Sequence, residues 1–364
     1  MARLERLWLT DFRGYAALDV TFDAGLTAVL GDNGQGKTNL VEAVAWLATL
    51  GSFRGAPTEA LVRDGAEQAV VRAELDSDGR AVLIEAEIPR RGRTRVQLNR
   101  QRLTRGRDLH GVVRVTVFSP DDLALVKEGP GERRRYLDEL LAARHPKFDA
   151  VRADVDKILR QRNTLLKQAG GRLSDEVAVT LDVWDTKLVE AGTALVDQRI
   201  ETLDALRPHL VRAYDQLAGA PAEVRIDYRA EWRAAGLAVA LAEARAIDVR
   251  RAVTTVGPHR DDVELAVGGL AARTHASQGE QRSFALALRL AAHRLITDEL
   301  GQPPILILDD VFSELDPDRG DALLDQLPEG QTLLTSAHGL PPRAHPDRLW
   351  RIADHHLAEV TDEW

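Results

Sequence analysis

The sequence predicts an α/β protein in which the two ends of the chain fold together into one domain, while the middle forms a second, helical lobe. Two apolar strand patterns lead to this prediction. The first, residues 26–30, is followed by a glycine-rich loop and a helix pattern, and the second, residues 305–308, ends in two carboxylates. A long stretch whose apolar residues have helical spacing separates them.

The glycine-rich loop fits the phosphate-loop pattern of glycine, four residues, then Gly-Lys-Thr. In that pattern, backbone N–H groups surround a phosphate at the positive end of helix 38–50, Lys37 reaches the β- and γ-phosphate oxygens, and Thr38 reaches Mg²⁺. An ordinary glycine turn is the alternative, but it does not explain the strand, the helix and the distant acidic strand together. The sequence therefore predicts an ATP site formed by Gly31, Asp32, Asn33, Gly34, Gln35, Gly36, Lys37 and Thr38.

Composition is that of an ordinary globular protein. The chain has 364 residues, of which 44% are hydrophobic and 29% charged, enough for two domains. No apolar run is long enough to span a bilayer, and the N-terminus has a strand pattern, so we expect a cytoplasmic protein without a membrane segment. Because cysteine is absent, disulfides and thiolate zinc sites are excluded, and any metal must arrive with the nucleotide.

The domain organisation follows from a change of pattern along the chain. Strand patterns dominate up to about residue 118, helical patterns follow from residue 131 to about 250, and strand patterns then return. We expect the helical stretch to be broken into separate helices at Pro146, Gly170-Gly171, Pro208 and 219–221. The prediction is a discontinuous α/β domain from residues 1–118 and 252–364, with residues 119–251 as the helical lobe.

A stripe of eight arginines without an acidic residue occupies residues 90–107. Apolar residues interrupt it at strand-like intervals with a turn near Asn99, which predicts a hairpin. The net charge of −9 argues against a generally basic surface but not against a local one. Two interpretations stay open, a solvated edge hairpin or a surface for DNA phosphates. The DNA candidates are Arg93, Arg95, Arg100 and Arg102.

A short motif, Ser277-Gln278-Gly279-Glu280-Gln281, precedes the helix pattern that leads into the acidic strand. Its first residues would stand at the exposed start of that helix, where unpaired N–H groups favour an anion. A plain N-cap by Ser277 is the alternative, but it does not explain why the motif lies between the two nucleotide motifs. This order resembles that of the ABC-class ATPases, which implies that Ser277, Gln278, Gly279 and Glu280 of one subunit cover the γ-phosphate held by another.

The same resemblance implies roles for residues after the two apolar strands. Asp309 would hold Mg²⁺ through water together with Thr38, and Asp310 would orient or deprotonate the attacking water beside Lys37. Most members of the class carry glutamate in place of Asp310, so the shorter side chain predicts slow hydrolysis. The γ-phosphate switch is expected at Ser336 or His338, and the choice stays open.

Further motifs resemble those of the RecF family of recombination mediators, which are ABC-class ATPases related to SMC proteins. They occur in order over nearly the whole chain, at residues 11–15, 52–54, 118–123, 129–138, 257–262 and 276–282. The helical stretch between about 140 and 250 matches only by position and length. Arginines 133–135, inside one motif, are a second DNA candidate or a structural contact between lobe and head.

This resemblance implies an ABC-type ATPase head with a short helical lobe. It also implies an ATP-dependent homodimer that binds single-stranded and duplex DNA without sequence preference and has weak, DNA-stimulated ATPase activity that times the dimer. The protein would act with RecR and RecO at single-strand gaps to load RecA, in replication, repair and the SOS response. A transport ATPase cassette would not carry so large a helical insertion, and an SMC-like arm would need a longer unbroken coiled coil.

Overall fold

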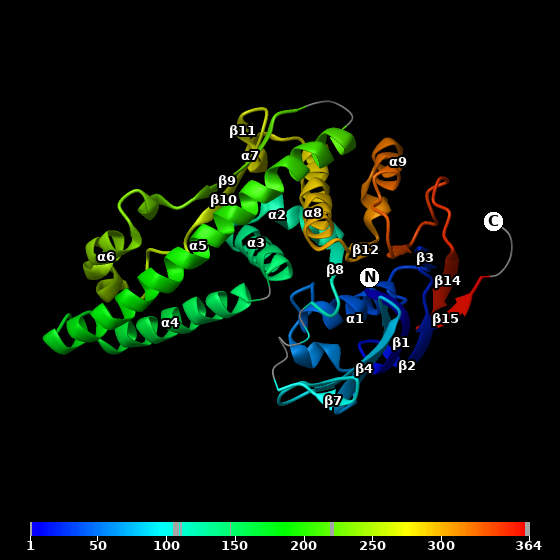
Figure 1. Ribbon diagram of the computed structural model, residues 1–364, viewed down its shortest axis with the longest axis horizontal. Helices are drawn as coiled ribbons and strands as arrows, with labels where there is room; N and C mark the ends of the chain where they lie inside the picture. Colours follow the sequence, from blue (N-terminus) through cyan, green and yellow to red (C-terminus); the bar gives the residue numbers. More distant parts are fainter. Residues whose placement is uncertain (1, 105–108, 110, 146, 219–221, 361–364) are drawn as a thin grey trace. The chain divides into compact units, whose positions relative to one another are not determined.

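The computed structural model describes residues 2–104, 109, 111–145, 147–218 and 222–360. Its contacts divide the chain into two compact units (Figure 1). Unit 1 comprises Met1–Asp122, Arg212–Pro221 and Ser283–Trp364, and unit 2 comprises Leu123–Val211 and Ala222–Arg282. The two ends of the chain therefore lie in one compact unit.

Unit 1 contains an antiparallel sheet built from the N-terminal third of the chain. Its strand order is β2-β1-β4-β5-β6-β7. Buried residues alternate with more exposed ones along most of these strands, as expected for a sheet with one face on a core. The strands are β1 (Ala2–Phe12), β2 (Tyr15–Thr21), β4 (Gln68–Ser77), β5 (Arg80–Pro89), β6 (Arg95–Leu98) and β7 (Gln101–Arg102).

The second sheet of unit 1 joins the two ends of the chain. Its order is β15-β14-β3-β13-β12-β8, and all neighbours are parallel except the edge pair β14–β15. Every residue of β12 and β13 is buried, as is typical of parallel strands covered on both faces. The strands are β3 (Leu26–Leu30), β8 (Val115–Phe118), β12 (Ile305–Asp309), β13 (Thr332–Ser336), β14 (Arg348–Ala353) and β15 (His356–Glu359).

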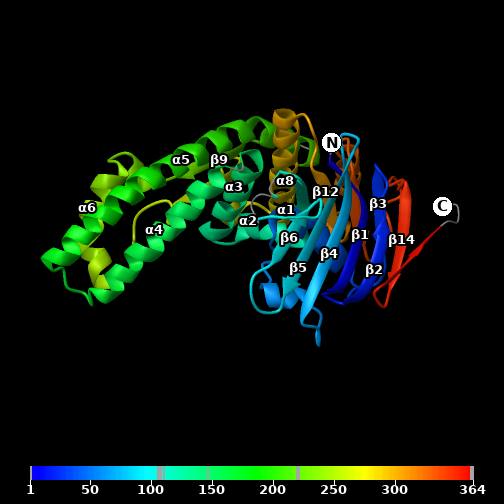
Figure 2. The same cartoon turned by 60° about the horizontal axis from the view of Figure 1, so that its bottom comes forward.

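Helix α1 (Lys37–Thr49) contacts strands of both sheets and buries most of its length. One hydrophobic core contains residues of this helix and of both sheets. Figure 2 shows the strands of unit 1 from the side. The four side chains expected to point inward are all buried: Leu40, Val41, Val44 and Leu47. The strand–loop–helix prediction is therefore confirmed. The remaining short elements around unit 1 are η1 (Thr58–Leu61), η3 (Pro120–Leu123), η5 (Val311–Glu314) and α9 (Pro317–Asp325).

Helix α8 (Gln278–Leu300) begins in unit 2 and continues in unit 1. The side chains expected to be buried along it are buried, namely Phe284, Leu288, Ala291 and Leu295. It also buries His293, which is 1% exposed and whose Nδ1 lies 3.2 Å from Thr116 Oγ1. Burial therefore lowers the pKa of His293 to about 4, with a smaller contribution from the positive charge of Arg294.

The buried His293 should make stability depend on pH. The unfolded chain, in which the pKa is about 6.5, binds more protons between pH 6.5 and 4 than the folded chain, so the free energy of unfolding falls as the pH falls through this range. We expect the wild type to lose about 2 kcal/mol more than His293→Gln between pH 7 and pH 5, measured by urea unfolding. An equal loss in both proteins would contradict this.

Unit 2 is mostly helical, with a small three-stranded sheet of order β11-β10-β9. Helices α4 and α5 share a hydrophobic core with α6, which includes Leu159, Leu188 and Leu241. The helices are α2 (Ala124–Lys127), α3 (Pro130–Arg144), α4 (Phe148–Gln168), α5 (Asp175–Ala218), α6 (Leu237–Arg251) and α7 (Ala272–His275), and η4 is Glu231–Arg233. The strands are β9 (Val224–Arg229), β10 (Asp262–Val267) and β11 (Leu270–Ala271).

The expected break at Pro208 is wrong, because Pro208 lies inside the 44-residue helix α5. Proline removes one helical hydrogen bond and normally costs about 3 kcal/mol. Here Leu206 and Leu210 on either side are fully buried, and this packing holds the helix across the proline.

Strand β9 was also missed inside the stretch predicted to be helical.

The compact units also differ from the predicted domain boundaries, because residues 252–282 cluster with unit 2. Strand β10 pairs with β9 along its length, from Asp262 opposite Arg229 to Val267 opposite Val224. Arg133 of α3 adds an ion pair, its Nε lying 2.9 Å from Asp262 Oδ1. Arg133 is thus a buried structural residue of unit 2, and the division into a functional head and lobe stays a prediction.

Candidate nucleotide site

The glycine-rich loop joins the end of β3 to the start of α1. Gly34 and Gly36 have φ angles of 84° and 111°, in the region that favours glycine. Gly31 is required for a different reason, since a Cβ there would lie 2.4 Å from the carbonyl oxygen of Ile352. The backbone conformation and the close approach of β14 therefore both select glycine in this loop.

Lys37 folds back over the loop. Its ammonium group donates hydrogen bonds to the carbonyl oxygens of Gly31 at 2.6 Å and Asp32 at 3.0 Å. Burial lowers the pKa of Lys37, opposed by the negative charges of Asp310, Asp309 and Asp32. The lysine is thus held over the loop, where a terminal phosphate would replace the carbonyls as its partner.

Thr38 and Asp309, which are 271 positions apart in the sequence, lie in contact. Thr38 Oγ1 donates to Asp309 Oδ1 at 3.0 Å, and Thr335 Oγ1 donates to the same oxygen at 2.7 Å. Burial raises the pKa of Asp309, while the two hydroxyl donors oppose that rise. The Thr38 hydroxyl at the start of α1 and the Asp309 carboxylate at the end of β12 are oxygen ligands suited to Mg²⁺, so the residues present fit a magnesium–nucleotide complex.

Asp310 has a left-handed backbone conformation, with φ of 51°. Its N–H donates to the carbonyl oxygen and to Oγ1 of Thr335, both at 3.1 Å. Its carboxylate Oδ1 accepts from the N–H of Ala337 at 3.3 Å. Thr335 of β13 therefore fixes the backbone of Asp310, and Ala337, directly after β13, fixes its carboxylate.

Thr335 contacts the carboxylate of Asp309 and the backbone N–H of Asp310, and sequence reasoning missed it. The signal that could have identified it is its place in a buried parallel strand, directly opposite Asp309 in the register of β12 and β13. Its neighbour Ser336 is 2% exposed, and its carbonyl accepts from the N–H of Gly31 at 3.3 Å. His338 is exposed, and its N–H donates to Ser336 Oγ at 3.3 Å. Of the two switch candidates, Ser336 therefore contacts the phosphate loop, through a hydrogen bond between its backbone carbonyl and Gly31.

The turn between β14 and β15 contacts the phosphate loop, and no local sequence pattern predicts this contact. The N–H of Asp354 donates to Gln35 Oε1 at 2.6 Å. Tyr15 donates to the carbonyl oxygen of Gly36 at 3.0 Å, and the ring of His355 packs edge-on against Tyr15 at 5.5 Å. Burial raises the pKa of Tyr15, so its hydroxyl stays protonated as a donor.

The Ser277 motif forms a reciprocal cap at the start of α8. The N–H of Ser277 donates to Glu280 Oε2 at 2.7 Å, and the N–H of Glu280 donates to Ser277 Oγ at 3.2 Å. Gln281 is buried and donates to the carbonyl oxygens of Ala272 and Arg273, both at 3.1 Å. The alternative of an N-cap is therefore correct as a description of Ser277, and it leaves Gln278 exposed at the helix start.

The predicted arginine hairpin is confirmed as β6 and β7, with Asn99 and Arg100 in left-handed conformations at the turn. Arg95 pairs with Glu87 at 3.1 Å. The other three DNA candidates, Arg93, Arg100 and Arg102, are exposed. Of the stripe, residues 105–108 lie outside the described part of the chain.

Comparisons with known proteins agree with this geometry. A family model described as "RecF/RecN/SMC N terminal domain" matches residues 3–336. The chain is 47% identical over 346 residues to the DNA replication and repair protein RecF of Streptomyces avermitilis, a match that covers 91% of this chain and 92% of the relative. This chain belongs to the RecF family. The RecF protein of Kineococcus radiotolerans is 44% identical over 357 residues, covering 91% of each chain.

Solved structures carry the same fold. A structure of the recombination mediator protein RecF with ATP, described as part of the RecFOR pathway, superposes with a TM-score of 0.91 at 28% identity, covering 99% of this chain and 98% of that one. An Smc head domain from Pyrococcus furiosus superposes with a TM-score of 0.58 at 18% identity, covering 99% and 96%, and shows the likeness of fold alone. The resemblance to the RecF family and the ABC-type ATPase fold are thus confirmed. No helix in the described part of the chain is long and apolar enough to cross a membrane.

Proposed function

We propose that this protein is an ATP-dependent DNA-binding protein of recombinational repair. The observation that carries the proposal is the contact between Thr38 and Asp309, which joins the phosphate loop to the acidic strand in one site. The relatives named RecF in DNA replication and repair, and the RecF structure with ATP, support it. We further propose that the protein is cytoplasmic and that it acts with RecR and RecO to load RecA at single-strand gaps.

The phosphate loop would bind the triphosphate of ATP through its backbone N–H groups. Lys37 would give up its hydrogen bonds to the carbonyl oxygens of Gly31 and Asp32 and bind β- and γ-phosphate oxygens in their place. The new hydrogen bonds would compensate for the loss of the old ones. Thr38 and Asp309 would hold Mg²⁺, Asp309 through water. When bound, Mg²⁺ neutralises negative charge that develops on the phosphate oxygens.

Asp310 would orient the attacking water and accept its proton. Its backbone is fixed by Thr335, so the carboxylate cannot follow the γ-phosphate far. Aspartate is one methylene shorter than the glutamate common in the ABC class, which favours slow hydrolysis that times a complex over rapid turnover. Stimulation of this hydrolysis by DNA is part of the proposal.

The Ser277 motif would cover the γ-phosphate bound by a second copy of the chain. Its cap uses the N–H groups of Ser277 and Glu280. In the described part of the chain, those of Gln278 and Gly279 have no hydrogen-bond partner, and they stand at the positive end of a 23-residue helix. ATP bound between two copies would stabilise the dimer by mass action.

Sedimentation with and without Mg²⁺–ATP tests the dimer, comparing the wild type with Ser277→Arg. A matched control is Ser174→Arg, because Ser174 is also an exposed serine ahead of a helix in unit 2 and accepts from the N–H of Val177 at 3.3 Å. We expect ATP to dimerise the wild type and the control but not Ser277→Arg, and a gapped duplex to travel with the dimer. A Ser277→Arg dimer as stable as the wild type would refute the trans-acting motif.

A further inference from the structure

Two segments of unit 2 contain no acidic residue although the whole chain has a net charge of −9. They are residues 157–174, in α4 and the turn after it, and residues 249–260, at the end of α6 and in the loop that follows. Together they contribute these basic residues: Lys157, Arg160, Arg162, Lys167, Arg172, Arg250, Arg251 and Arg260. Neither segment contains Phe, Trp or Tyr.

The fold brings these two segments into contact. Asn163 Oδ1 on α4 accepts from the N–H of Thr254 at 2.8 Å and from its Oγ1 at 2.7 Å. Arg160 and Lys167 lie one turn before and after Asn163, on the same side of the helix. Arg251 ends α6 three positions before Thr254. Basic residues from both segments therefore gather on one part of unit 2.

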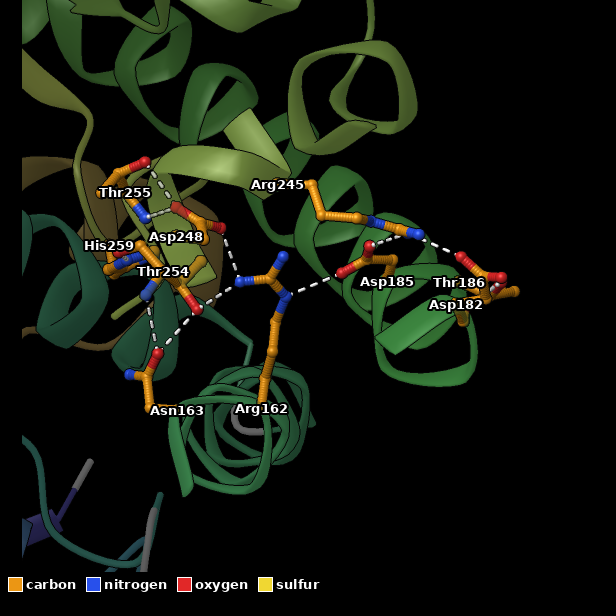
Figure 3. Close-up of polar contacts among 10 residues, drawn as sticks. All are labelled: Arg162, Asn163, Asp182, Asp185, Thr186, Arg245, Asp248, Thr254, Thr255 and His259. Atoms are coloured by element: carbon orange, nitrogen blue, oxygen red, sulfur yellow. Dashed lines mark hydrogen bonds and ion pairs between the residues drawn. The ribbon is translucent and has the colours of Figure 1, made fainter. Parts of the chain in front are cut away.

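The buried Arg162 forms ion pairs with the carboxylates of Asp185 and Asp248, as Figure 3 shows. It is fully buried, and its guanidinium lies 2.7 Å from Asp185 Oδ1 and 2.7 Å from Asp248 Oδ2. The other oxygen of Asp248 accepts from the N–H of Thr255 at 2.9 Å. The negative charges inside this part of unit 2 are thus already balanced, and they do not neutralise the arginines on its surface.

Seven basic side chains of the two segments are exposed and have no carboxylate partner among the residues that the structure describes: Lys157, Arg160, Lys167, Arg172, Arg250, Arg251 and Arg260. Four of them lie on the two helices and nearest in sequence to the contact between Asn163 and Thr254, namely Arg160, Lys167, Arg250 and Arg251. We refer to these four residues as the α4–α6 basic surface. Other exposed or half-exposed arginines of unit 2 differ from them, since each of the following pairs with a carboxylate: Arg207, Arg225, Arg229 and Arg233.

We propose that the α4–α6 basic surface binds the phosphate backbone of duplex DNA. The proposal rests on the DNA-binding function proposed above and places a contact in the lobe, away from the arginine hairpin. Unpaired arginines and lysine on two helices suit phosphates at fixed spacing. Binding of single strands generally uses stacking on aromatic side chains, and the absence of aromatic residues from both segments favours duplex.

The test compares two variants that each remove four positive charges. In the first, the four residues of the α4–α6 basic surface are changed to glutamine. In the matched control, the four paired arginines of unit 2 are changed to glutamine: Arg207, Arg225, Arg229 and Arg233. Binding of a random-sequence duplex is measured at several salt concentrations with Mg²⁺–ATP present. Binding of a fluorescent ATP analogue is measured in parallel.

Each positive charge that neutralises a DNA phosphate should account for about 0.9 of the slope of log K against log salt. We expect the surface variant to lose a slope of about 2–4 and at least tenfold in duplex affinity at about 0.15 M salt, while the control keeps the wild-type slope and all three proteins bind the ATP analogue equally. Equal duplex slopes in the two variants would overturn the inference. Failure of the wild type itself to bind any DNA would instead overturn the proposed function.

Competition with poly-L-glutamate distinguishes an acidic protein partner from DNA. If the surface variant loses poly-L-glutamate binding but keeps its duplex slope, the surface serves an acidic polypeptide and the inference is overturned. If duplex binding falls in the surface variant and single-strand binding does not, the assignment to duplex is supported.

Discussion

Replacing Asp310 with asparagine is expected to slow ATP hydrolysis by about 10²- to 10⁴-fold while ATP binding persists. The reason is specific to the proton-accepting role proposed for this carboxylate. Asparagine keeps an oxygen that can accept from the N–H of Ala337, and the backbone bonds of Asp310 to Thr335 do not involve its side chain. The variant should therefore keep the local geometry and lose only the negative charge and the base.

Asp310→Glu is the matched control, because it keeps the carboxylate and adds one methylene. Single-turnover hydrolysis, measured together with equilibrium binding of ATP, separates the chemical step from binding. The glutamate variant should hydrolyse at least as fast as the wild type. Equal rates in the wild type and both variants would remove Asp310 from the chemistry.

Replacing Arg162 with methionine is expected to destabilise unit 2 by about 3–5 kcal/mol. The change leaves the buried Asp185 and Asp248 without their shared cation, and unpaired buried charges are costly. Asp185 keeps one partner, since Arg245 Nη2 lies 2.7 Å from its Oδ2, whereas Asp248 is fully buried and keeps only neutral donors. The loss of stability should therefore be greatest where α4 packs against α6.

Hydrogen exchange read by mass spectrometry locates this destabilisation. Peptides from α4 and α6 should exchange faster in Arg162→Met, while peptides from the core of unit 1 keep their protection. Arg152→Met is the control, because Arg152 lies on the same helix and pairs with Asp149 at 2.8 Å in a half-exposed position. That pair is worth less than about 1 kcal/mol. Similar increases in hydrogen exchange in both variants would show that the buried ion pairs of Arg162 stabilise unit 2 no more than the exposed pair of Arg152.

The sequence alone predicts the features that lie in consecutive residues. The phosphate-loop pattern needs glycines at fixed offsets between a strand and a helix, and the N-cap of α8 needs a serine at position 277. Both requirements are local, so they can be recognised without coordinates. The same holds for the hairpin turn at Asn99 and for the buried face of α8.

Tertiary structure decided the features that depend on residues far apart. Thr335 reaches the carboxylate of Asp309 and the backbone N–H of Asp310 only because β13 pairs in parallel register with β12. The turn at Asp354 braces Gln35 from 319 positions away. Helix α5 continues through Pro208 because burial on both sides outweighs a local preference, and residues 252–282 join unit 2 because β10 pairs with β9. Local propensity determines which short elements form, but register and burial, which involve the whole chain, determine which of them meet.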